Sequence, residues 1–336
     1  MTNTQIETSR LGSTGPAVGR IALGAMGMSG SYGPADETES AATIHAALDS
    51  GARLVDTGDF YGMGHNELLV GRAIADRPRE ETILSVKFGG MIGPDGSWQG
   101  FDSRPAALRN FLSYSLRRLG VDHVDIYRPA RLDPAVPIED TVGAIAELVD
   151  AGYVRHIGLS EVGAETLRRA AAVHPIADLQ IEYSLFSRGI EAEILPVCRE
   201  LGIGITAYGV LSRGLLSDTM RGRTDFHGSD YRAHTPRFQG ANLTANLELV
   251  GTLASLAEQK GVSTAQLAIG WVLSRGEDIV PVIGARTRSR WAEALGALDV
   301  SLTAADIAAI EAAVPVGGVA GSRYAEAQMN ALDSER

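Results

Sequence analysis

The sequence predicts an α/β fold of the (β/α)8, or TIM-barrel, type on two observations. Short runs rich in Val, Ile and Leu alternate with amphipathic helical stretches from about residue 20 to residue 300. The apolar runs lack strict alternation of apolar and polar residues, as expected for parallel strands that are buried on both faces. Eight such runs, each followed by a helical stretch, match the tally of a (β/α)8 barrel.

The expected strands are short and recur along the whole chain. They are Ile21–Ala25, Leu54–Asp56, Ile83–Lys87, Val124–Tyr127, Val154–Ser160, Leu179–Tyr183, Gly204–Tyr208 and Ile279–Ile283. The helical stretches between them include Thr38–Ser50, Pro105–Leu119, Glu139–Ala151, Glu165–His174, Glu191–Leu201 and Ser263–Ser274. Several have recognisable ends, such as Pro105 at a helix start and Gly51 or Gly152 just past a helix end.

A doubly wound sheet is the competing architecture, and it usually carries a G-x-G-x-x-G phosphate fingerprint. No expected strand is followed by that motif, because Gly24, Gly27 and Gly30 have the wrong spacing. The sequence therefore favours the barrel.

One domain is expected over residues 1–336, with the barrel itself at 21–300. Turn residues at the centre of residues 7–20 predict an N-terminal β-hairpin that plugs the barrel floor. Extra helices are expected outside the repeat at Leu243–Lys260 and Thr303–Val314, the second of them in a C-terminal helix and tail at 301–336.

Composition excludes several classes of function. The net charge of −11 argues against a nucleic-acid-binding face, which would be basic. The longest apolar runs are too short for a membrane span, and Met1–Thr4 does not begin a secretion signal, so we expect a cytoplasmic protein. The single Cys198 excludes an internal disulfide and a cysteine-ligated zinc site. The sequence also contains no His-x-x-x-His cluster that would predict a metal site.

Lys87 is the most informative single residue. It is one of only two lysines, and it ends an apolar strand-like run. Burying a lysine costs several kcal/mol unless it is paired, and barrel enzymes place catalytic groups at strand ends. The other lysine, Lys260, precedes Gly261 at an expected helix C-terminus and is expected to be solvated.

Asp56 ends the neighbouring strand and Tyr61 follows it, so both are expected at the same rim as Lys87. A free phenol has a pKa of about 10 and is a slow proton donor at neutral pH. An adjacent cation lowers the phenol pKa, and a carboxylate holds that cation in place. The trio therefore predicts an acid that protonates a developing alkoxide. The alternative is a structural Asp56–Lys87 ion pair with Tyr61 packed over it.

These residues lie in segments that resemble motifs of the aldo-keto reductases. Residues 54–67 resemble their D-T-A-x-x-Y-G-x-G-x-x-E segment, and Ser85–Gly89 resembles their T-K-x-G segment. Further matches occur in family order over roughly residues 8 to 325, namely Asp133–Thr141, Gly158–Ser160, Gln180–Tyr183 and Arg237–Gly240. The chain is most similar to the NADP-dependent bacterial and fungal members that include the pyridoxal-reductase-like enzymes.

The resemblance implies an NADPH-dependent reductase of small aldehydes or ketones. Tyr61 is the implied proton donor, with Lys87 and Asp56 tuning it. NADPH is expected to lie across the barrel mouth and to pass a hydride to the carbonyl carbon. Ser160 and Gln180 match positions that bind the nicotinamide carboxamide, and Tyr183 matches the position that stacks on its ring. The implied pyrophosphate contacts are Tyr208, Val210, Leu211, Arg213 and Gly214.

The adenosine end of the cofactor is expected after the eighth strand, which ends at Ile283 and Gly284. Arg286, Arg288 and Arg290 begin the helix that follows, and arginine forks at a helix N-terminus suit a phosphate monoester. They favour NADP over NAD, although a solvated basic helix face is the simpler alternative. Glu293 matches the family's adenine-contacting position.

The sequence departs from the family pattern at the end of the fourth strand. Ala130 stands where members usually carry a histidine, and it cannot donate a hydrogen bond to the substrate. Losing one such donor typically costs about 3 kcal/mol in barrier. A slow enzyme, a donor supplied from elsewhere, and an NADPH-binding protein with little turnover all remain open. Glu161 also stands where members often have asparagine.

The substrate pocket is expected to include position 27, a glycine (Gly27) between Met26 and Met28, together with Trp98 and Ala130. Three loops are expected to shape selectivity, namely Met91–Phe101, Ser217–Asn242 and Gly317–Asn330. The small-molecule carbonyl substrate and the oligomeric state are not readable from the sequence.

Two other functions remain open. A lone lysine on a barrel strand also suits a Schiff-base lyase, although pairing with Asp56 would keep the amine protonated. Ala130 leaves open a regulatory or sensor protein that binds NADPH without reducing a substrate.

Overall fold

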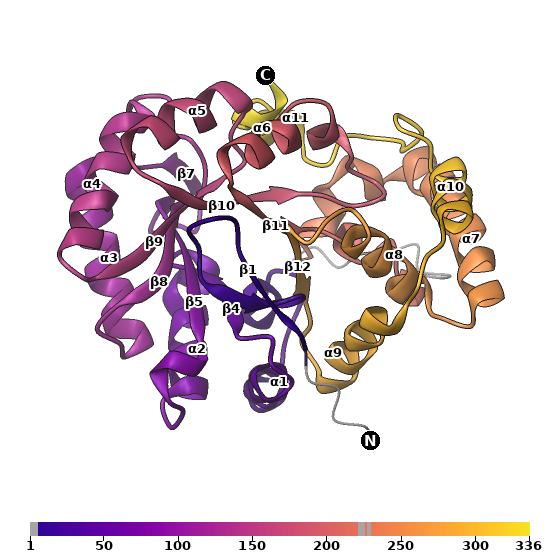
Figure 1. Ribbon diagram of the computed structural model, residues 1–336, viewed down its shortest axis with the longest axis horizontal. Helices are drawn as coiled ribbons and strands as arrows, with labels where there is room; N and C mark the ends of the chain where they lie inside the picture. Colours follow the sequence, from indigo (N-terminus) through magenta and orange to yellow (C-terminus); the bar gives the residue numbers. More distant parts are fainter. Residues whose placement is uncertain (1–5, 221–225, 227–229) are drawn as a thin grey trace.

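The computed structural model describes residues 6–220, 226 and 230–336. In this part of the chain eight parallel strands close into a barrel with helices around it, which confirms the predicted (β/α)8 fold (Figure 1). Around the barrel the strands follow chain order: β3 (Ala22–Gly24), β4 (Leu54–Gly58), β5 (Ile83–Phe88), β8 (Val124–Pro129), β9 (Val154–Ser160), β10 (Ile176–Glu182), β11 (Gly204–Tyr208) and β12 (Ile279–Gly284).

Helices follow the strands and cover the outside of the barrel. They are α1 (Glu37–Asp49), α2 (His65–Ile74), α3 (Pro105–Leu119), α4 (Ile138–Asp150), α5 (Ala164–Val173), α6 (Ile194–Leu201), α7 (Gly240–Lys260), α8 (Thr264–Leu273), α9 (Arg288–Leu295), α10 (Ala304–Ala313) and the short α11 (Glu326–Met329). Local chemistry fixes their ends: Ser263 and Gln266 form a capping box at α8, and Gly261 ends α7 in a left-handed conformation. No helix in the described ranges is long and apolar enough to cross a membrane.

A hairpin closes the bottom of the barrel. Strands β1 (Thr8–Arg10) and β2 (Ala17–Gly19) pair antiparallel, and Figure 1 draws this hairpin in indigo across the barrel strands. Its Leu11 and Val18 are buried in one apolar cluster with inward-facing side chains of the barrel, namely Ala22, Leu54, Ile83, Ile126, Val280 and Val282. The N-terminal ends of the strands are thereby sealed by apolar packing.

Two expected loops contain regular structure. Residues 91–101 are not an open loop, because β6 (Gly90–Ile92) and β7 (Trp98–Phe101) pair as an antiparallel hairpin. The expected loop Ser217–Asn242 contains short 3-10 turns and the first turn of α7. Residues 221–225 and 227–229 of that loop lie outside the described residues.

Candidate active site

Asp56, Lys87 and Gln180 form a closed ring of hydrogen bonds at the C-terminal end of the barrel. Lys87 Nζ donates to Asp56 Oδ2 at 2.5 Å and to Gln180 Oε1 at 2.6 Å. Gln180 Nε2 in turn donates to Asp56 Oδ1 at 2.8 Å. All three side chains are nearly fully buried. The ammonium is therefore held in one position by two partners from different strands.

Burial is the main influence on the ionisation of Lys87. It lowers the pKa, the charge of Asp56 opposes that effect, and Arg128 lowers the pKa further, so that it lies at about 8. Lys87 is therefore still mainly protonated at neutral pH.

A second polar layer lies below this ring inside the barrel. Arg128 is completely buried and donates to Ser85 Oγ and to Asp178 Oδ1, both at 3.0 Å, and to Thr206 Oγ1 at 3.1 Å. Ser85 Oγ then donates to Asp56 Oδ1 at 2.9 Å. Arg128 thus supports the ring of Asp56, Lys87 and Gln180 from below. Sequence reasoning missed it, although a charged residue inside the apolar run 124–129 was a usable signal.

Tyr61 is positioned by a tight turn directly after β4. Gly62, Met63 and Gly64 have φ of 55°, 53° and 91°, so the chain reverses through successive left-handed residues before α2 begins. Asn66 anchors this turn to the barrel by donating to Ala25 O at 2.9 Å and accepting from Thr57 Oγ1 at 2.7 Å.

The Tyr61 ring lies against Lys87, whose Nζ is 5.3 Å from the ring centroid. Only 8% of Tyr61 is exposed, yet no described residue makes a hydrogen bond with its hydroxyl. Burial raises the pKa of Tyr61 well above 10, the charge of Asp56 raises it further, and the charge of Arg131 lowers it. This direction corrects the lowered pKa expected from the sequence, because burial outweighs the nearby cations. The hydroxyl is therefore protonated and has a free donor.

Ala130 closes the site on the side of β8. It is 2% exposed, and its amide donates to Phe88 O at 2.8 Å. The nearest histidines in the motif order are occupied elsewhere, His65 with Ser29 and Glu37 and His123 with Asp122. Neither takes the place of the missing imidazole.

The C-terminal tail is fixed to the end of β9 through Glu161, a residue with a left-handed φ of 52°. The two carboxylate oxygens accept from Arg323 Nη1 at 2.8 Å and Nη2 at 2.6 Å. They also accept from Ser334 Oγ and Tyr208 Oη at 2.6 Å and from the Glu182 amide at 2.9 Å. Burial would raise the pKa of Glu161, but these bonds and the Arg323 charge outweigh it and lower the pKa to about 2.

Tyr324 of the same tail lies over the barrel rim. Its hydroxyl is 2.7 Å from Tyr208 Oη and 3.4 Å from Arg131 Nη2, and the Arg213 guanidinium lies 4.5 Å from its ring centroid. Figure 1 shows the yellow end of the chain beside α5, where Asp333 Oδ2 accepts from the Gly163 amide at 2.8 Å. The tail therefore forms part of the rim.

Comparison with known proteins agrees with this geometry. The family model described as the aldo/keto reductase family matches residues 20–315. The chain is 42% identical over 327 residues to probable aldo-keto reductase 1 of Glycine max, covering 96% of this chain and 93% of that protein. The chain belongs to the aldo-keto reductase family.

Solved structures of other aldo-keto reductases share the fold. The glycerol dehydrogenase of Gluconobacter oxydans superposes with a TM-score of 0.82 at 32% identity, covering 93% of this chain and 95% of that one. The holo form of an aldo-keto reductase from Bacillus halodurans gives a TM-score of 0.76 at 25% identity, covering 92% and 97%. Family membership makes this protein an oxidoreductase of carbonyl compounds, and members generally use nicotinamide cofactors.

The structure does not bring every predicted residue of this aldo-keto reductase to the rim. Tyr183 is completely buried, its ring lies 5.5 Å from that of Trp271, and its hydroxyl donates to Glu191 at 2.7 Å. It is therefore unavailable to stack on a nicotinamide ring, which corrects the expectation from the sequence. Tyr208, the tyrosine that ends β11, lies at the rim instead.

The loop after β11 has the features of an anion site. Ser212 and Arg213 have left-handed φ of 45° and 55°, and Gly209 and Gly214 are also left-handed. Ser212 Oγ and Arg213 Nη1 are buried and have no hydrogen-bond partner among the described residues. Such a curved backbone with unused donors is typical of phosphate-binding loops. The expected contacts Val210 and Leu211 belong to the same loop.

The arginines after β12 all have protein partners. Arg286 Nη1 donates to the carbonyls of residues 32–34 at 3.2–3.4 Å. Arg288 donates through its amide and guanidinium to Glu39, and Arg290 pairs with Glu293 at 2.9 Å. Gly284 is exposed and Ile283 is buried at the strand end.

The residues expected to form the substrate pocket lie in different parts of the structure. Gly27 lies beside Arg286 and Tyr32, where an added Cβ would be 3.5 Å from each side chain. Trp98 is 51% exposed, and its ring packs edge-on at 6.1 Å against Phe60, which packs in the same way at 4.9 Å against Tyr61. The β6–β7 hairpin therefore reaches Tyr61 through a row of aromatic rings.

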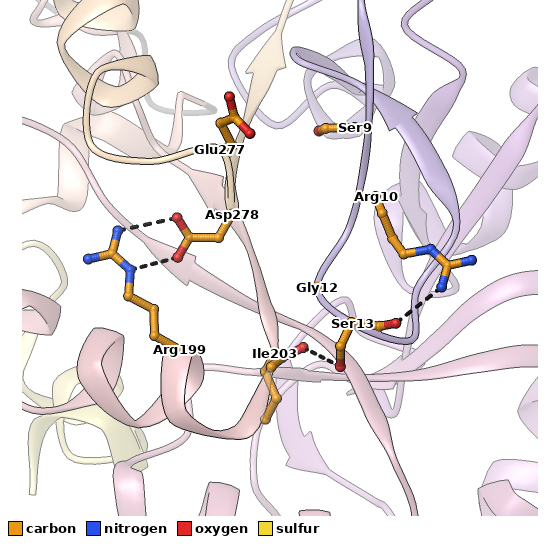
Figure 2. A pocket seen from close by; sticks show the side chains of 9 residues that line it. Ser9, Arg10, Gly12, Ser13, Arg199, Ile203, Glu277 and Asp278 are labelled. Carbon is orange, nitrogen blue, oxygen red and sulfur yellow. Dashed lines mark hydrogen bonds and ion pairs between the residues drawn. The ribbon is translucent and has the colours of Figure 1, made fainter.

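A surface depression of about 500 Å3 lies at the opposite end of the barrel (Figure 2). It lies between the hairpin and the residues that precede β12, and Ser13 of the hairpin donates at its edge to Gly202 O at 3.0 Å. Arg199 pairs there with Asp278 at 2.8 Å. None of the predicted site residues lines it. Because barrel enzymes react at the C-terminal strand ends, the rim around Lys87 is the candidate active site.

Proposed function

We propose that this protein reduces an aldehyde or ketone to an alcohol by hydride transfer from NADPH, with Tyr61 as the proton donor. One observation carries the proposal: the hydroxyl of Tyr61 has no hydrogen-bond partner in the described chain, and the Tyr61 ring lies beside an ammonium that is itself fixed. A free donor next to a fixed cation is the arrangement that general acid catalysis of carbonyl reduction needs.

Bound NADPH supplies the hydride that the carbonyl carbon accepts. As negative charge develops on the carbonyl oxygen, Tyr61 transfers its proton to that oxygen. Lys87 stabilises the phenolate that remains, because its Nζ lies 5.3 Å from the ring centroid. Asp56 and Gln180 keep Lys87 in place, so the site is organised before substrate binds.

The residues at the rim fit an anionic dinucleotide. Ser212 Oγ and Arg213 Nη1 are unused buried donors that suit the pyrophosphate. Ser160 Oγ, at the end of β9, suits the nicotinamide carboxamide, and Tyr208 Oη lies 2.6 Å from a carboxylate oxygen of Glu161, the next residue in the chain. At the other end Arg286 and Arg290, near the N-terminus of α9, suit a 2′-phosphate, which supports NADP over NAD.

The test is NADPH and NADH oxidation with a panel of aldehydes, diketones and pyridoxal, for wild type and Tyr61→Phe. We expect turnover that prefers NADPH and disappears in Tyr61→Phe. Turnover that is unchanged in Tyr61→Phe would contradict the assignment of the proton donor.

Ala130 favours a second candidate, a regulatory protein that binds NADPH with little turnover. Tight NADPH binding without reduction of any carbonyl in the panel would support it. A Schiff-base lyase that uses Lys87 is a weaker candidate, because a lysine fixed by Asp56 and Gln180 is a poor nucleophile. Borohydride trapping of a keto substrate on Lys87 would reveal that chemistry.

A further inference from the structure

Arg131 is a cation at the rim without a direct anionic partner. Its Nη1 donates to Ala130 O at 2.6 Å and to Ser160 Oγ at 3.3 Å, and its Nη2 donates to Tyr324 Oη at 3.4 Å. All three acceptors are neutral. No described carboxylate lies within ion-pair distance of its guanidinium.

The neighbouring rim arginines differ in this respect. Each of them is matched with a buried carboxylate: Arg323 with Glu161, Arg213 and Arg237 with Glu182, and Arg232 with Asp230. Arg131 is partly buried, so its charge is only weakly screened by solvent. A guanidinium carries five N–H donors, and two of the three bonds that Arg131 makes are long. It can therefore donate to a ligand without breaking a strong bond.

The position of Arg131 connects it with the missing histidine. It directly follows Ala130, and its guanidinium folds back onto the Ala130 carbonyl and reaches the end of β9. The charge of Arg131 lowers the pKa of Tyr61 against the larger effect of burial, and it also contributes to the lowered pKa of Lys87. The guanidinium is therefore close enough to Tyr61 and Lys87 for its charge to act on both.

We propose that Arg131 donates the second hydrogen bond to the carbonyl oxygen that is reduced, the bond that Ala130 cannot make. The inference rests on the proposed function. In the reaction the carbonyl carbon accepts a hydride, the C=O π electrons move to oxygen, and that oxygen takes the proton of Tyr61. The Tyr61 phenolate is then reprotonated by water. Arg131 keeps its own protons throughout and stabilises the charge that passes between the two oxygens.

The test compares Arg131→Met and Arg131→Lys with wild type on neutral aldehydes. We expect Arg131→Met to lower kcat about 100-fold, as loss of one oxyanion donor does, with NADPH affinity by fluorescence titration unchanged. Arg131→Lys keeps the charge but not the planar fork, so we expect a smaller loss. The matched control is Arg168→Met, which removes an exposed arginine paired with Glu200 on the outer helices and is expected to keep full activity.

A rescue experiment separates this role from a structural one. Adding Ala130→His to Arg131→Met places a histidine where family members usually carry one. The double variant is expected to have a kcat at least 10-fold higher than that of Arg131→Met. The basic limb of the pH profile is expected to move to higher pH in Arg131→Met, because removal of the cation raises the pKa of both Tyr61 and Lys87. The other groups that act on Tyr61 stay in place, namely Asp56, Tyr32 and Tyr324.

Several outcomes would overturn the inference. An unchanged kcat in a folded Arg131→Met variant would overturn it. An increase in KM confined to aldehydes that carry a carboxylate would also overturn it, because it would show that Arg131 binds substrate anions. Loss of NADPH affinity in parallel with kcat would assign Arg131 to the cofactor. If circular dichroism shows that Arg131→Met is unfolded, the Arg131→Lys variant decides the question. A kcat equal to that of wild type in Arg131→Lys would then contradict the inference. Wild type that binds NADPH but reduces no carbonyl would overturn the proposed function and this inference together.

Discussion

Glu161 and Arg323 form a buried bidentate ion pair, with N–O distances of 2.8 and 2.6 Å, that ties the C-terminal tail to the end of β9. The two residues are 162 positions apart in the chain. Through this pair the tail places Tyr324 against Tyr208 and Arg131, so the shape of the barrel rim depends on it.

Breaking this ion pair on one side is expected to destabilise the protein strongly. Arg323→Met leaves a buried carboxylate without its cation, and we expect a loss of about 3–5 kcal/mol in the free energy of unfolding. Adding Glu161→Gln to Arg323→Met removes the uncompensated charge and should recover part of that loss. Denaturant melts of the two single variants and the double variant give the coupling free energy. Additive effects would show that the pair is not energetically coupled.

The tail contact is also expected to weaken in acid. The pKa of Glu161 is about 2 in the folded protein against an ordinary value of 4.5, so its stabilising effect is complete above about pH 4.5 and is lost as pH falls towards 2. Hydrogen exchange of residues 317–336 between pH 5 and pH 3 measures this loss. Glu161→Gln should remove the pH dependence, and an identical dependence in that variant would assign it to other groups.

The ionisation of Lys87 is expected to set the upper pH limit of activity. Its pKa of about 8 means that the ammonium loses its proton above that pH, so kcat should fall from about pH 8 upward. Asp56→Asn removes the charge that raises this pKa, and the limb should therefore move to lower pH by about 1–3 units. Rate profiles of wild type and Asp56→Asn test this prediction. A limb that moves to higher pH in Asp56→Asn would contradict it.

Two arginines are expected to affect cofactor binding differently. Arg213→Met removes a donor from the proposed pyrophosphate site. It should weaken the binding of NADPH and of NADH by a similar factor of about 10. Arg290→Met should weaken the binding of NADPH but not of NADH, because only NADPH carries the 2′-phosphate. Fluorescence titration of both cofactors with both variants measures the factors. A selective loss of NADPH in Arg213→Met would reverse the two assignments.

Much of the barrel could be predicted because its strands carry local signals. The apolar runs and helix ends were enough for the eightfold repeat, and reading the strand ends in order was enough to place Lys87 with Asp56. Gln180 was predicted as a cofactor contact, and its two bonds to Lys87 and Asp56 were not foreseen. Contacts across the barrel depend on how strands from distant parts of the chain are aligned, and no local pattern encodes that alignment.

The remaining misses have similar physical reasons. Tyr183 follows directly after β10, and the sequence alone does not tell which way a residue faces once the strand has ended. The hairpin at residues 90–101 escaped prediction because its strands are short and contain glycines. The tail 317–330 was expected to shape selectivity, but the contacts of Arg323 and Tyr324 within it could not be predicted, because their partners lie far away in the chain.

The most direct test of the central proposal is the rate of NADPH oxidation with a reactive aldehyde in wild type and in Tyr61→Phe, at matched NADPH occupancy. Tyr61→Phe removes one hydroxyl that has no partner in the described chain, so the fold should be preserved. We predict measurable turnover in wild type and a fall of at least 100-fold in the variant. Equal rates in the two proteins would contradict the assignment of Tyr61 as the proton donor.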